Sequence, residues 1–170
     1  MAIFYTTDNL PVFQSPVITI GTFDGVHLGH YAILEKVRQH ANHIGGESIL
    51  LTFEPHPRKL IFPDQPIKIL TPLDKKIELV GNAGIRHVVV VPFTKDFACL
   101  SAREYVTDFL VSLFHPAAIV IGYDHHFGND RKGNIDLLKE LQGDYGFEVV
   151  EIPAQLIEDA TVSSTKIRNA

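Results

Sequence analysis

The chain has 170 residues, of which 45% are apolar and 21% are charged, an ordinary composition for a soluble globular protein. A chain of this length buries roughly 70% of its unfolded surface in one compact domain, so we expect a single domain over residues 1–170. The net charge of -5 and the isoelectric point of 5.9 argue against a basic surface for nucleic acid or anionic membranes.

Cysteine usage and hydropathy indicate a cytoplasmic enzyme or binding domain. Cys99 is the single cysteine, which excludes an intrachain disulfide. Residues 1–10 lack the basic segment and apolar core of a secretory signal. A membrane span needs about 20 continuous apolar residues, whereas the apolar stretch 117–121 is bounded by Pro116 and Gly122.

Five short apolar runs, rich in valine and isoleucine, predict β-strands. They are residues 17–20, 48–53, 87–91, 118–121 and 147–152. The first four runs lack sustained alternation with polar residues, which is typical of strands buried on both faces of a parallel sheet.

The segments between these runs have apolar residues at helical spacing. From residue 29 to residue 44, apolar residues recur every three or four positions until a glycine pair ends the pattern. A second helix is predicted with Thr71 as its N-cap, Pro72 at its first position and Gly84 at its end. The side chains expected to face the core from this helix are Leu73, Ile77 and Val80.

Two further helices are predicted from their N-terminal caps. Ser101 and Glu104 have the spacing of a capping box, and Asn134 precedes another helical pattern. The first of these helices is expected to bury Ala102, Tyr105, Val106, Phe109, Leu110 and Leu113. The second is expected to bury Ile135, Leu138 and Leu141.

The alternation of strands and helices predicts the fold class. Strand–helix–strand units with right-handed crossovers build an α/β fold. We therefore expect a Rossmann-like, doubly wound parallel sheet of about five strands. Ligands bind such sheets beyond the carboxyl ends of the strands, so a site is expected in the loops that follow the apolar runs.

The loop after the first strand carries glycines and two histidines into a helix. Residues 21–30 read Gly-Thr-Phe-Asp-Gly-Val-His-Leu-Gly-His. The glycines permit close approach of a ligand to the backbone, and the helix start offers free N–H groups to a phosphate. His27 and His30 are three residues apart, so both imidazoles can face one anion.

Other interpretations of this loop are weaker. It matches neither the GxGxxG pattern nor a P-loop, which disfavours hydride transfer and Walker-type ATP hydrolysis. A zinc pair would lack a third ligand of convincing spacing nearby. The structural alternative is a glycine turn with two solvated histidines.

Three further segments combine groups that bind aromatic rings or phosphates. Pro55 and Pro57 flank His56 in a stiff loop after the second strand. Residues 122–133 hold aromatics and two cations, which can stack on a flat ring and bind phosphate, together with carboxylates. Residues 162–168 place consecutive hydroxyls before two cations. The structural alternatives are a redirecting loop, an exposed polar loop and an ordinary helix start.

Residues 21–30 resemble the signature of the nucleotidyltransferase superfamily, whose core is His-x-Gly-His. With Phe-Asp-Gly ahead of that core, the segment is similar to the adenylyltransferase module of bacterial bifunctional riboflavin kinase/FAD synthetases. The other segments resemble that family's Phe-x-Pro-x-Pro, Gly-x-Asp/Asn-Phe-x-Phe-Gly-x-x-Arg-x-Gly and Ile-Ser-Ser-Thr-x-Ile-Arg motifs, in order. The resemblance covers residues 17–168 and implies adenylyl transfer from ATP to FMN, giving FAD and pyrophosphate, on a nucleotidyltransferase-type fold.

The resemblance also implies a role for each matching residue. Catalytic roles are implied for His27, His30 and Arg168. ATP-binding roles are implied for Gly21, Thr22, Phe23, Asp24, Gly29, Ser163, Ser164 and Thr165. Flavin-binding roles are implied for Phe53, Pro55, Pro57, Asp124, Phe127, Gly128 and Arg131. FMN and FAD are expected as substrate and product, and Mg²⁺ is expected to enter with ATP, on protein ligands that the sequence does not identify.

Two departures from the family pattern bear on these expectations. His125 stands where the family usually has phenylalanine, which affects the flavin contact more than the reaction. The family normally continues into a riboflavin kinase domain, which is absent here, so riboflavin phosphorylation is not expected from residues 1–170. The alternatives are a nucleotidyltransferase with another phosphate acceptor, a non-catalytic nucleotide- or flavin-binding module, and an interaction domain of a larger enzyme.

Overall fold

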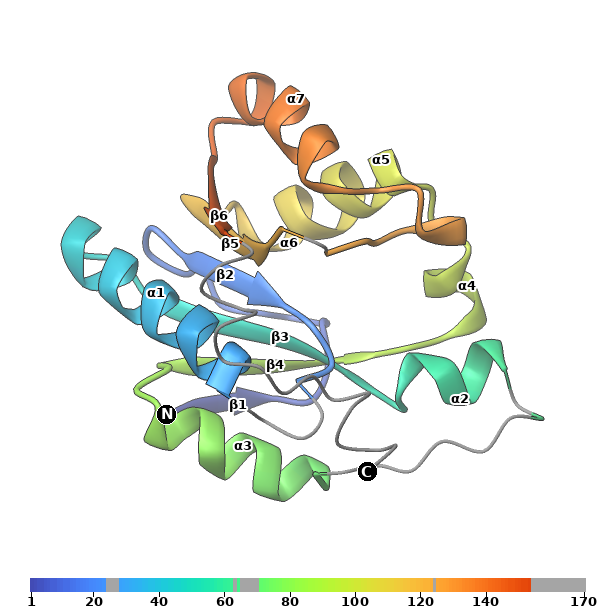
Figure 1. The fold of residues 1–170 in the computed structure, drawn as a ribbon, viewed down its shortest axis with the longest axis horizontal. Coiled ribbons are helices and arrows are strands. Elements are labelled where there is room, and N and C mark those ends of the chain that lie inside the picture. Colours follow the sequence, from blue (N-terminus) through green and yellow to red (C-terminus); the bar gives the residue numbers. More distant parts are fainter. Residues whose placement is uncertain (24–27, 63, 65–70, 124, 154–170) are drawn as a thin grey trace.

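The computed structural model describes residues 1–23, 28–62, 64, 71–123 and 125–153. Within them, six strands form one parallel sheet in the order β1-β4-β3-β2-β5-β6 (Figure 1). The strands are β1 (Ala2–Phe4), β2 (Val17–Ile20), β3 (Ser48–Glu54), β4 (His87–Pro92), β5 (Ala118–Gly122) and β6 (Glu148–Ile152). The predicted α/β class and parallel sheet are confirmed, and β2 to β6 correspond to the apolar runs.

The strand that the sequence pattern did not predict is β1. It has three residues and lies at the edge of the sheet, where Ile3 pairs with Val88 and Phe4 with Val89 of β4. A strand this short, with one exposed side chain between two half-buried ones, has no clear periodic signal. The sheet therefore has six strands rather than about five.

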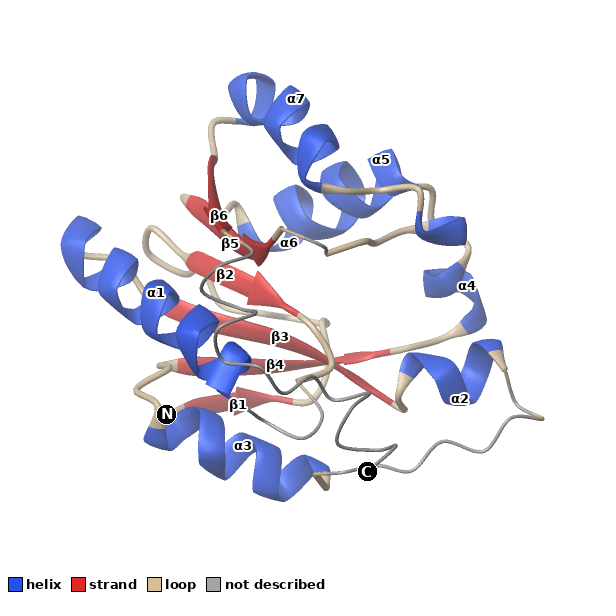
Figure 2. Ribbon diagram, in the orientation of Figure 1, coloured by secondary structure: helices blue, strands red, loops and turns tan. Residues whose placement is uncertain are grey.

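Helices cover both faces of this sheet (Figure 2). They are α1 (Leu28–Ile44), α2 (Pro57–Ile61), α3 (Leu73–Asn82), α4 (Lys95–Ala98), α5 (Ala102–Glu104), the π-helix η1 (Tyr105–Val111), α6 (Ser112–Phe114), the 3₁₀-helix η2 (Asn129–Arg131) and α7 (Ile135–Tyr145). The short helices α2, α4 and η2 were not predicted. Among the described residues, no helix is long and apolar enough to cross a bilayer.

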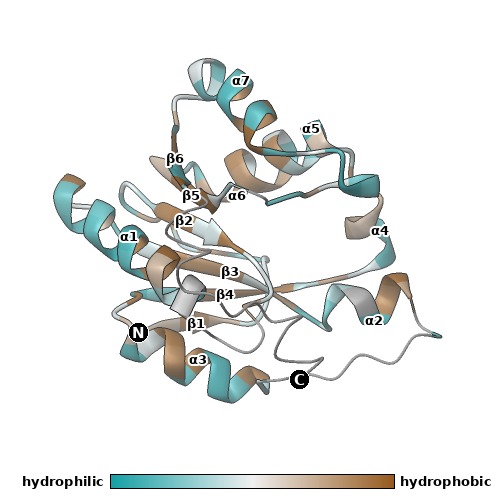
Figure 3. Cartoon of the chain, viewed as in Figure 1, coloured by the Kyte–Doolittle hydropathy of each residue, from teal (hydrophilic) through white to brown (hydrophobic). Residues whose placement is uncertain are grey.

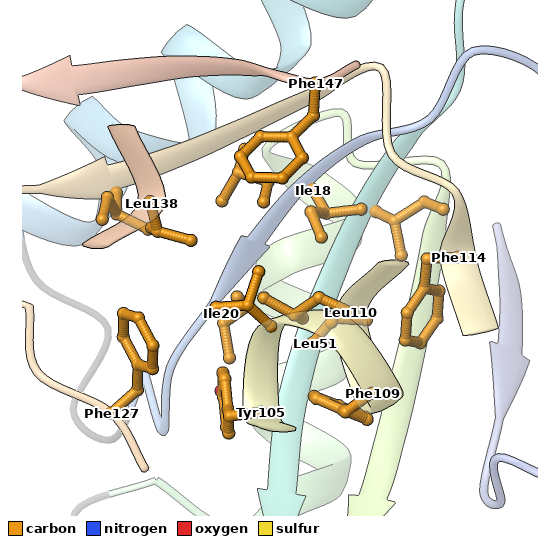
Figure 4. Close-up of a cluster of buried hydrophobic side chains, with 14 of the residues drawn as sticks. Ile18, Ile20, Leu51, Tyr105, Phe109, Leu110, Phe114, Phe127, Leu138 and Phe147 are labelled. Carbon is orange, nitrogen blue, oxygen red and sulfur yellow. The ribbon is translucent and has the colours of Figure 1, made fainter. Parts of the chain in front are cut away.

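Alternate side chains of the central strands supply two separate hydrophobic cores. Leu51 of β3 and Val89 of β4 belong to the core beneath η1 and α7, which Figure 4 shows in part. Leu50 and Val88 belong to the core beneath α1 and α3. Both faces of these strands are therefore buried, which explains why their sequences lack polar alternation. In Figure 3, β3 and β4 are mainly hydrophobic, whereas α1 and α7 mix hydrophobic and hydrophilic residues.

Two of the predicted helix caps are confirmed. The Ser101 hydroxyl accepts a hydrogen bond from the Glu104 N–H, and the Glu104 carboxylate accepts one from the Ser101 N–H, both at 3.1 Å. At the start of α7, the Asn134 side chain accepts a hydrogen bond from the Leu137 N–H at 3.2 Å. Both caps satisfy N–H groups that a helix start would otherwise leave without a partner.

The predicted start of α3 was wrong by one residue. Pro72, rather than Thr71, is the N-cap, because its carbonyl accepts a helical hydrogen bond from the Lys76 N–H while its ψ of 155° is extended. The Thr71 side chain is buried instead. The helix begins at Leu73, and its buried face contains a lysine, Lys76, that the apolar pattern did not predict.

The helix that follows Ser101 contains a π-helical segment, because α5 continues through η1 into α6. The i→i+5 hydrogen bonds of a π-helix widen its turns, which moves the core-facing position along the chain. Leu113, which was expected to be buried, is 36% exposed, whereas Phe114 is 2% exposed. The prediction for Leu113 was therefore wrong.

Candidate active site

Three of the loops identified in the sequence leave the same end of the sheet. All the strands are parallel, so the loops after β2, β3 and β5 emerge at the carboxyl ends of neighbouring strands (Figure 1). From β2 the chain continues to β3 on one side, while β5 lies on the other side of β2. Doubly wound sheets bind their ligands at such a topological switch point.

The loop after β2 is fixed to the end of β3 by hydrogen bonds. The Gly21 N–H donates to the Leu51 carbonyl at 3.0 Å, and the Thr52 hydroxyl donates to the Thr22 carbonyl at 3.2 Å. Phe23 has a φ of 48°, which is uncommon for a residue other than glycine. A Cβ added at Gly21 would lie 2.9 Å from the Phe23 ring, so glycine is needed beneath this ring.

The Phe23 ring in turn packs against His30. The ring centroids lie 4.7 Å apart, with their planes tilted by 43°. His30 is half-buried in the first turn of α1, a helix of 17 residues, and Gly29 precedes it. Free N–H groups and the positive end of the helix macrodipole lie at the same helix start. An imidazole held beside them is arranged to bind an anion such as phosphate.

A cleft of about 450 Å³ opens beside the loop after β3, a volume within the range of small-ligand sites. It is lined by Phe53, Glu54, His56, Lys59, Thr71, Pro72, Leu73 and Lys76. Of the predicted flavin-binding residues, Phe53 forms part of its wall. Pro55 is exposed after a cis peptide bond, and Pro57 begins α2. An aromatic wall near the exposed Lys59 suits a flat ring that carries a phosphate.

The loop after β5 closes around Phe127. Phe127 and Gly133 exchange backbone hydrogen bonds of 3.1 and 2.8 Å, and a Cβ on Gly133 would overlap the Phe127 ring. Gly128 has a φ of 78°, and a Cβ there would come within 2.6 Å of the Ala102 Cα. The side chain of Arg131 is exposed, so its guanidinium is accessible from solvent.

An aromatic network joins the two predicted flavin-binding motifs. The buried Phe127 ring lies 4.9 Å from Tyr105 at an angle of 27° (Figure 4). The network continues from Tyr105 to Phe97 at 5.8 Å and from Phe97 to Phe53 at 5.6 Å. Burial raises the pKa of the Tyr105 phenol above its ordinary value, because the low-dielectric surroundings disfavour the charged form. Phe97 and Tyr105 were not predicted as part of the site, because only tertiary packing brings them there.

The rest of the predicted site lies outside the described residues. These residues are Asp24, His27, Asp124, Ser163, Ser164, Thr165 and Arg168. Within the part of the chain that the structure describes, no group of three histidine, cysteine or acidic side chains could hold a metal ion. We therefore assign no Mg²⁺ ligand.

Curated relatives of this chain are similar to it in sequence over most of its length. They include bifunctional riboflavin kinase/FMN adenylyltransferases from Listeria monocytogenes, 38% identical over 156 residues, and Escherichia coli K12, 32% identical over 154 residues. A third, from Buchnera aphidicola of Acyrthosiphon pisum, is 35% identical over 157 residues. These alignments cover 91% to 92% of this chain and 49% to 50% of each relative. The chain thus spans about half the length of the curated relatives it matches.

Two solved structures share the fold. A macrolide-efflux protein from Streptococcus pneumoniae matches 99% of this chain and 56% of its own, with a TM-score of 0.79 at 23% identity. A pantoate-beta-alanine ligase from Francisella tularensis, complexed with beta-gamma ATP and beta-alanine, matches 98% of this chain and 75% of its own, with a TM-score of 0.56 at 15% identity. At these identities the likeness concerns the fold alone. Residues 11–166 match the family model described as FAD synthetase, and the chain belongs to that family.

Proposed function

We propose that this chain transfers an adenylyl group from ATP to FMN, giving FAD and pyrophosphate. The main support for the proposal is that His30 packs against Phe23 at the start of α1, at the switch point of the sheet. The chain also belongs to the FAD synthetase family. The names of the curated relatives include FMN adenylyltransferase, which supports FMN as the acceptor.

In the proposed reaction, a phosphate oxygen of FMN attacks the α-phosphorus of ATP in line. A bond forms between that oxygen and the α-phosphorus, while the bond to the bridging oxygen breaks and its electron pair leaves with pyrophosphate. A phosphate monoester has a second pKa of about 6, so FMN is largely ionised at neutral pH and needs no general base. Because FMN itself attacks the α-phosphorus, we propose a single displacement without a covalent enzyme intermediate.

The chain must bring two anions together and offset the charge that grows on the leaving group. We propose that His30, packed on Phe23, and the N–H groups at the start of α1 bind the ATP phosphates. The proposed catalytic set adds His27 and Arg168. The other residues proposed to line the nucleotide are Gly21, Thr22, Phe23, Asp24, Gly29, Ser163, Ser164 and Thr165.

We place the flavin beside the loop after β3. Phe53 supplies an aromatic wall to the cleft there, and Lys59 supplies a cation for phosphate. The other residues proposed to contact the flavin are Pro55, Pro57, Asp124, Phe127, Gly128 and Arg131. Mg²⁺ would enter on the ATP phosphates and offset their charge, and no step is assigned to a metal on this chain.

Riboflavin phosphorylation is not part of this proposal. The curated relatives are named as bifunctional and the chain spans about half of their length, so we propose that residues 1–170 act with a riboflavin kinase domain that lies outside them. We also propose a cytoplasmic location. The single cysteine and the acidic net charge of -5 suit that compartment and a substrate other than nucleic acid.

The test is to incubate the chain with ATP, Mg²⁺ and either FMN or riboflavin, and to separate the products by chromatography. We expect FAD and pyrophosphate in equal amounts from FMN, and no FMN from riboflavin. Transfer to another phosphate acceptor, with no FAD from FMN, would identify a different nucleotidyltransferase. Binding of ATP and FMN without release of pyrophosphate would identify a non-catalytic module.

A further inference from the structure

Lys76 is a charged residue in a buried position on α3. It is 6% exposed, although lysine is rarely buried. Ile77 and Val80 of the same helix belong to the core beneath α1 and α3. The Lys76 ammonium donates a hydrogen bond to the Thr52 hydroxyl of β3 at 3.3 Å. A cation is therefore held at the end of the strand that fixes the loop after β2.

The hydrogen bonds that begin at Lys76 run in one direction. An ammonium group has only donors, so Thr52 must accept from Lys76. The single proton of the Thr52 hydroxyl is then donated to the Thr22 carbonyl, at 3.2 Å. Thr52 is fully buried, so water does not compete for its hydroxyl. The relay thus links α3, β3 and the loop after β2.

We propose that Lys76 is a positioning residue for nucleotide binding, acting through Thr52 on the loop after β2. This inference rests on the proposed function, in which that loop binds ATP. Fixing the Thr22 carbonyl fixes its neighbours Gly21 and Phe23, and Phe23 packs against His30. Loss of the relay should therefore loosen the histidine and the backbone that face the phosphates.

The position of Lys76 also connects the two proposed substrate sites. Lys76 lies in the wall of the cleft beside Phe53, where we place the flavin. Its hydrogen bond to Thr52 leads from that cleft to the nucleotide loop. We expect loss of Lys76 to weaken the binding of ATP more than that of FMN, because the relay ends at Thr22.

The test compares Lys76→Met with Lys75→Met, a matched control on the same helix. The Lys75 side chain is 55% exposed and pairs with Glu78 at the surface. We expect Lys76→Met to raise the Kd of Mg-ATP, measured by calorimetry without FMN, about tenfold, as for loss of a hydrogen bond to a charged group. Lys75→Met should leave that Kd unchanged, and Lys76→Arg should recover part of the affinity. In turnover, the KM for ATP should rise more than the KM for FMN.

A second pair of variants tests the relay where Lys76→Met does not fold. Thr52→Val removes the hydroxyl and keeps the branched shape, whereas Thr52→Ser keeps the hydroxyl. Weaker ATP binding by the valine variant than by the serine variant would support the relay, and equal binding would overturn it. In soluble double variants, Lys76→Met with Thr52→Val should bind ATP no more weakly than the weaker single variant. Additive losses would show that Lys76 acts without Thr52 and would overturn the inference.

The measurements separate this inference from the proposed function. A wild-type chain that binds ATP but makes no FAD would reject FMN adenylylation, while the Kd values would still decide the role of Lys76. A wild-type chain that binds no ATP would overturn both. Equal Kd values for the Lys76→Met and Lys75→Met variants, in a chain that makes FAD, would overturn the inference alone.

Discussion

His30 is the described residue on which the proposed chemistry depends most directly. Its ring is held by Phe23, whose own position requires glycine at residue 21. The free N–H groups at the start of α1 lie beside it. A donor that is fixed before the substrate arrives needs little reorganisation when charge develops on the leaving group.

We predict that His30→Ala lowers kcat for FAD formation by about 10²–10³, the loss typical for removing one donor to a developing negative charge. His43→Ala is the control, because His43 is exposed in the last turn of the same helix. The measurement is the initial rate of FAD production at saturating ATP and FMN. Equal kcat values for the two variants would contradict a role for His30 in the reaction.

The α5–η1–α6 helix buries a different residue near its end from the one that regular α-helical spacing predicts. Phe114 is 2% exposed and packs on Phe109 and Phe13, at ring-centroid separations of 5.8 and 6.4 Å. Leu113, its neighbour, is 36% exposed. Regular α-helical spacing from Ser101 had placed Leu113 in the core.

We predict that Phe114→Ala lowers the free energy of unfolding by about 3–5 kcal/mol, because it leaves a cavity in the core. Leu113→Ala should cost less than about 1 kcal/mol, since a residue that is 36% exposed leaves an opening to solvent rather than a closed cavity. Urea denaturation followed by circular dichroism measures both values. A larger loss of stability for Leu113→Ala than for Phe114→Ala would indicate that Leu113, as regular α-helical spacing predicts, is the buried residue.

The sequence predicted the elements whose signal is local. Strands such as β3 are buried on both faces, so an apolar run identified them, and the Ser101 cap is formed between residues three apart. β1 has no such signal, because its place is set by pairing with β4. The π-helical turns of η1 were also not predicted, because an i→i+5 pattern is not visible in a short sequence.

Prediction of the candidate site was limited in the same way. The motif of residues 21–30 placed His30 at a helix start after the first predicted strand, and the structure has it there. Phe97 and Lys76 lie far along the chain from the residues they contact, Phe53 and Thr52 respectively. A lysine on a buried helix face also looks, in sequence, like an ordinary solvated charge.

At the scale of the whole molecule, Glu47 joins segments at the amino ends of the strands, opposite the site. Its carboxylate accepts hydrogen bonds from the Gln14 N–H at 2.6 Å and from the His87 Nε2 at 2.9 Å. Its Oε1 also lies 3.6 Å from the Nε of Arg86. The Glu47 side chain is 18% exposed, so these contacts are partly shielded from water. The hydrogen bond from His87, followed by that from Gln14, lowers the pKa of Glu47 in the folded chain.

A lowered pKa sets the sign of the pH dependence. Because the folded chain binds the proton less tightly than the unfolded chain, the contribution of Glu47 is complete well above the ordinary carboxyl pKa of about 4.5. It is lost as the pH falls through the folded pKa. Glu47→Gln should therefore lower stability at pH 7 by about 1–3 kcal/mol, and this deficit should shrink as the pH falls below about 4.5.

Denaturation of the wild-type, Glu47→Gln and Glu78→Gln chains over this pH range tests the prediction. Glu78 is the control, because its side chain is 60% exposed and its pair with Lys75 lies at the surface. Since Glu47 lies at the edge of the sheet opposite the candidate site, Glu47→Gln should leave the Kd of Mg-ATP unchanged where the chain is folded. A deficit that stays constant with pH would show that Glu47 acts through packing rather than charge. A weakened ATP affinity in the folded variant would show that the two ends of the sheet are coupled.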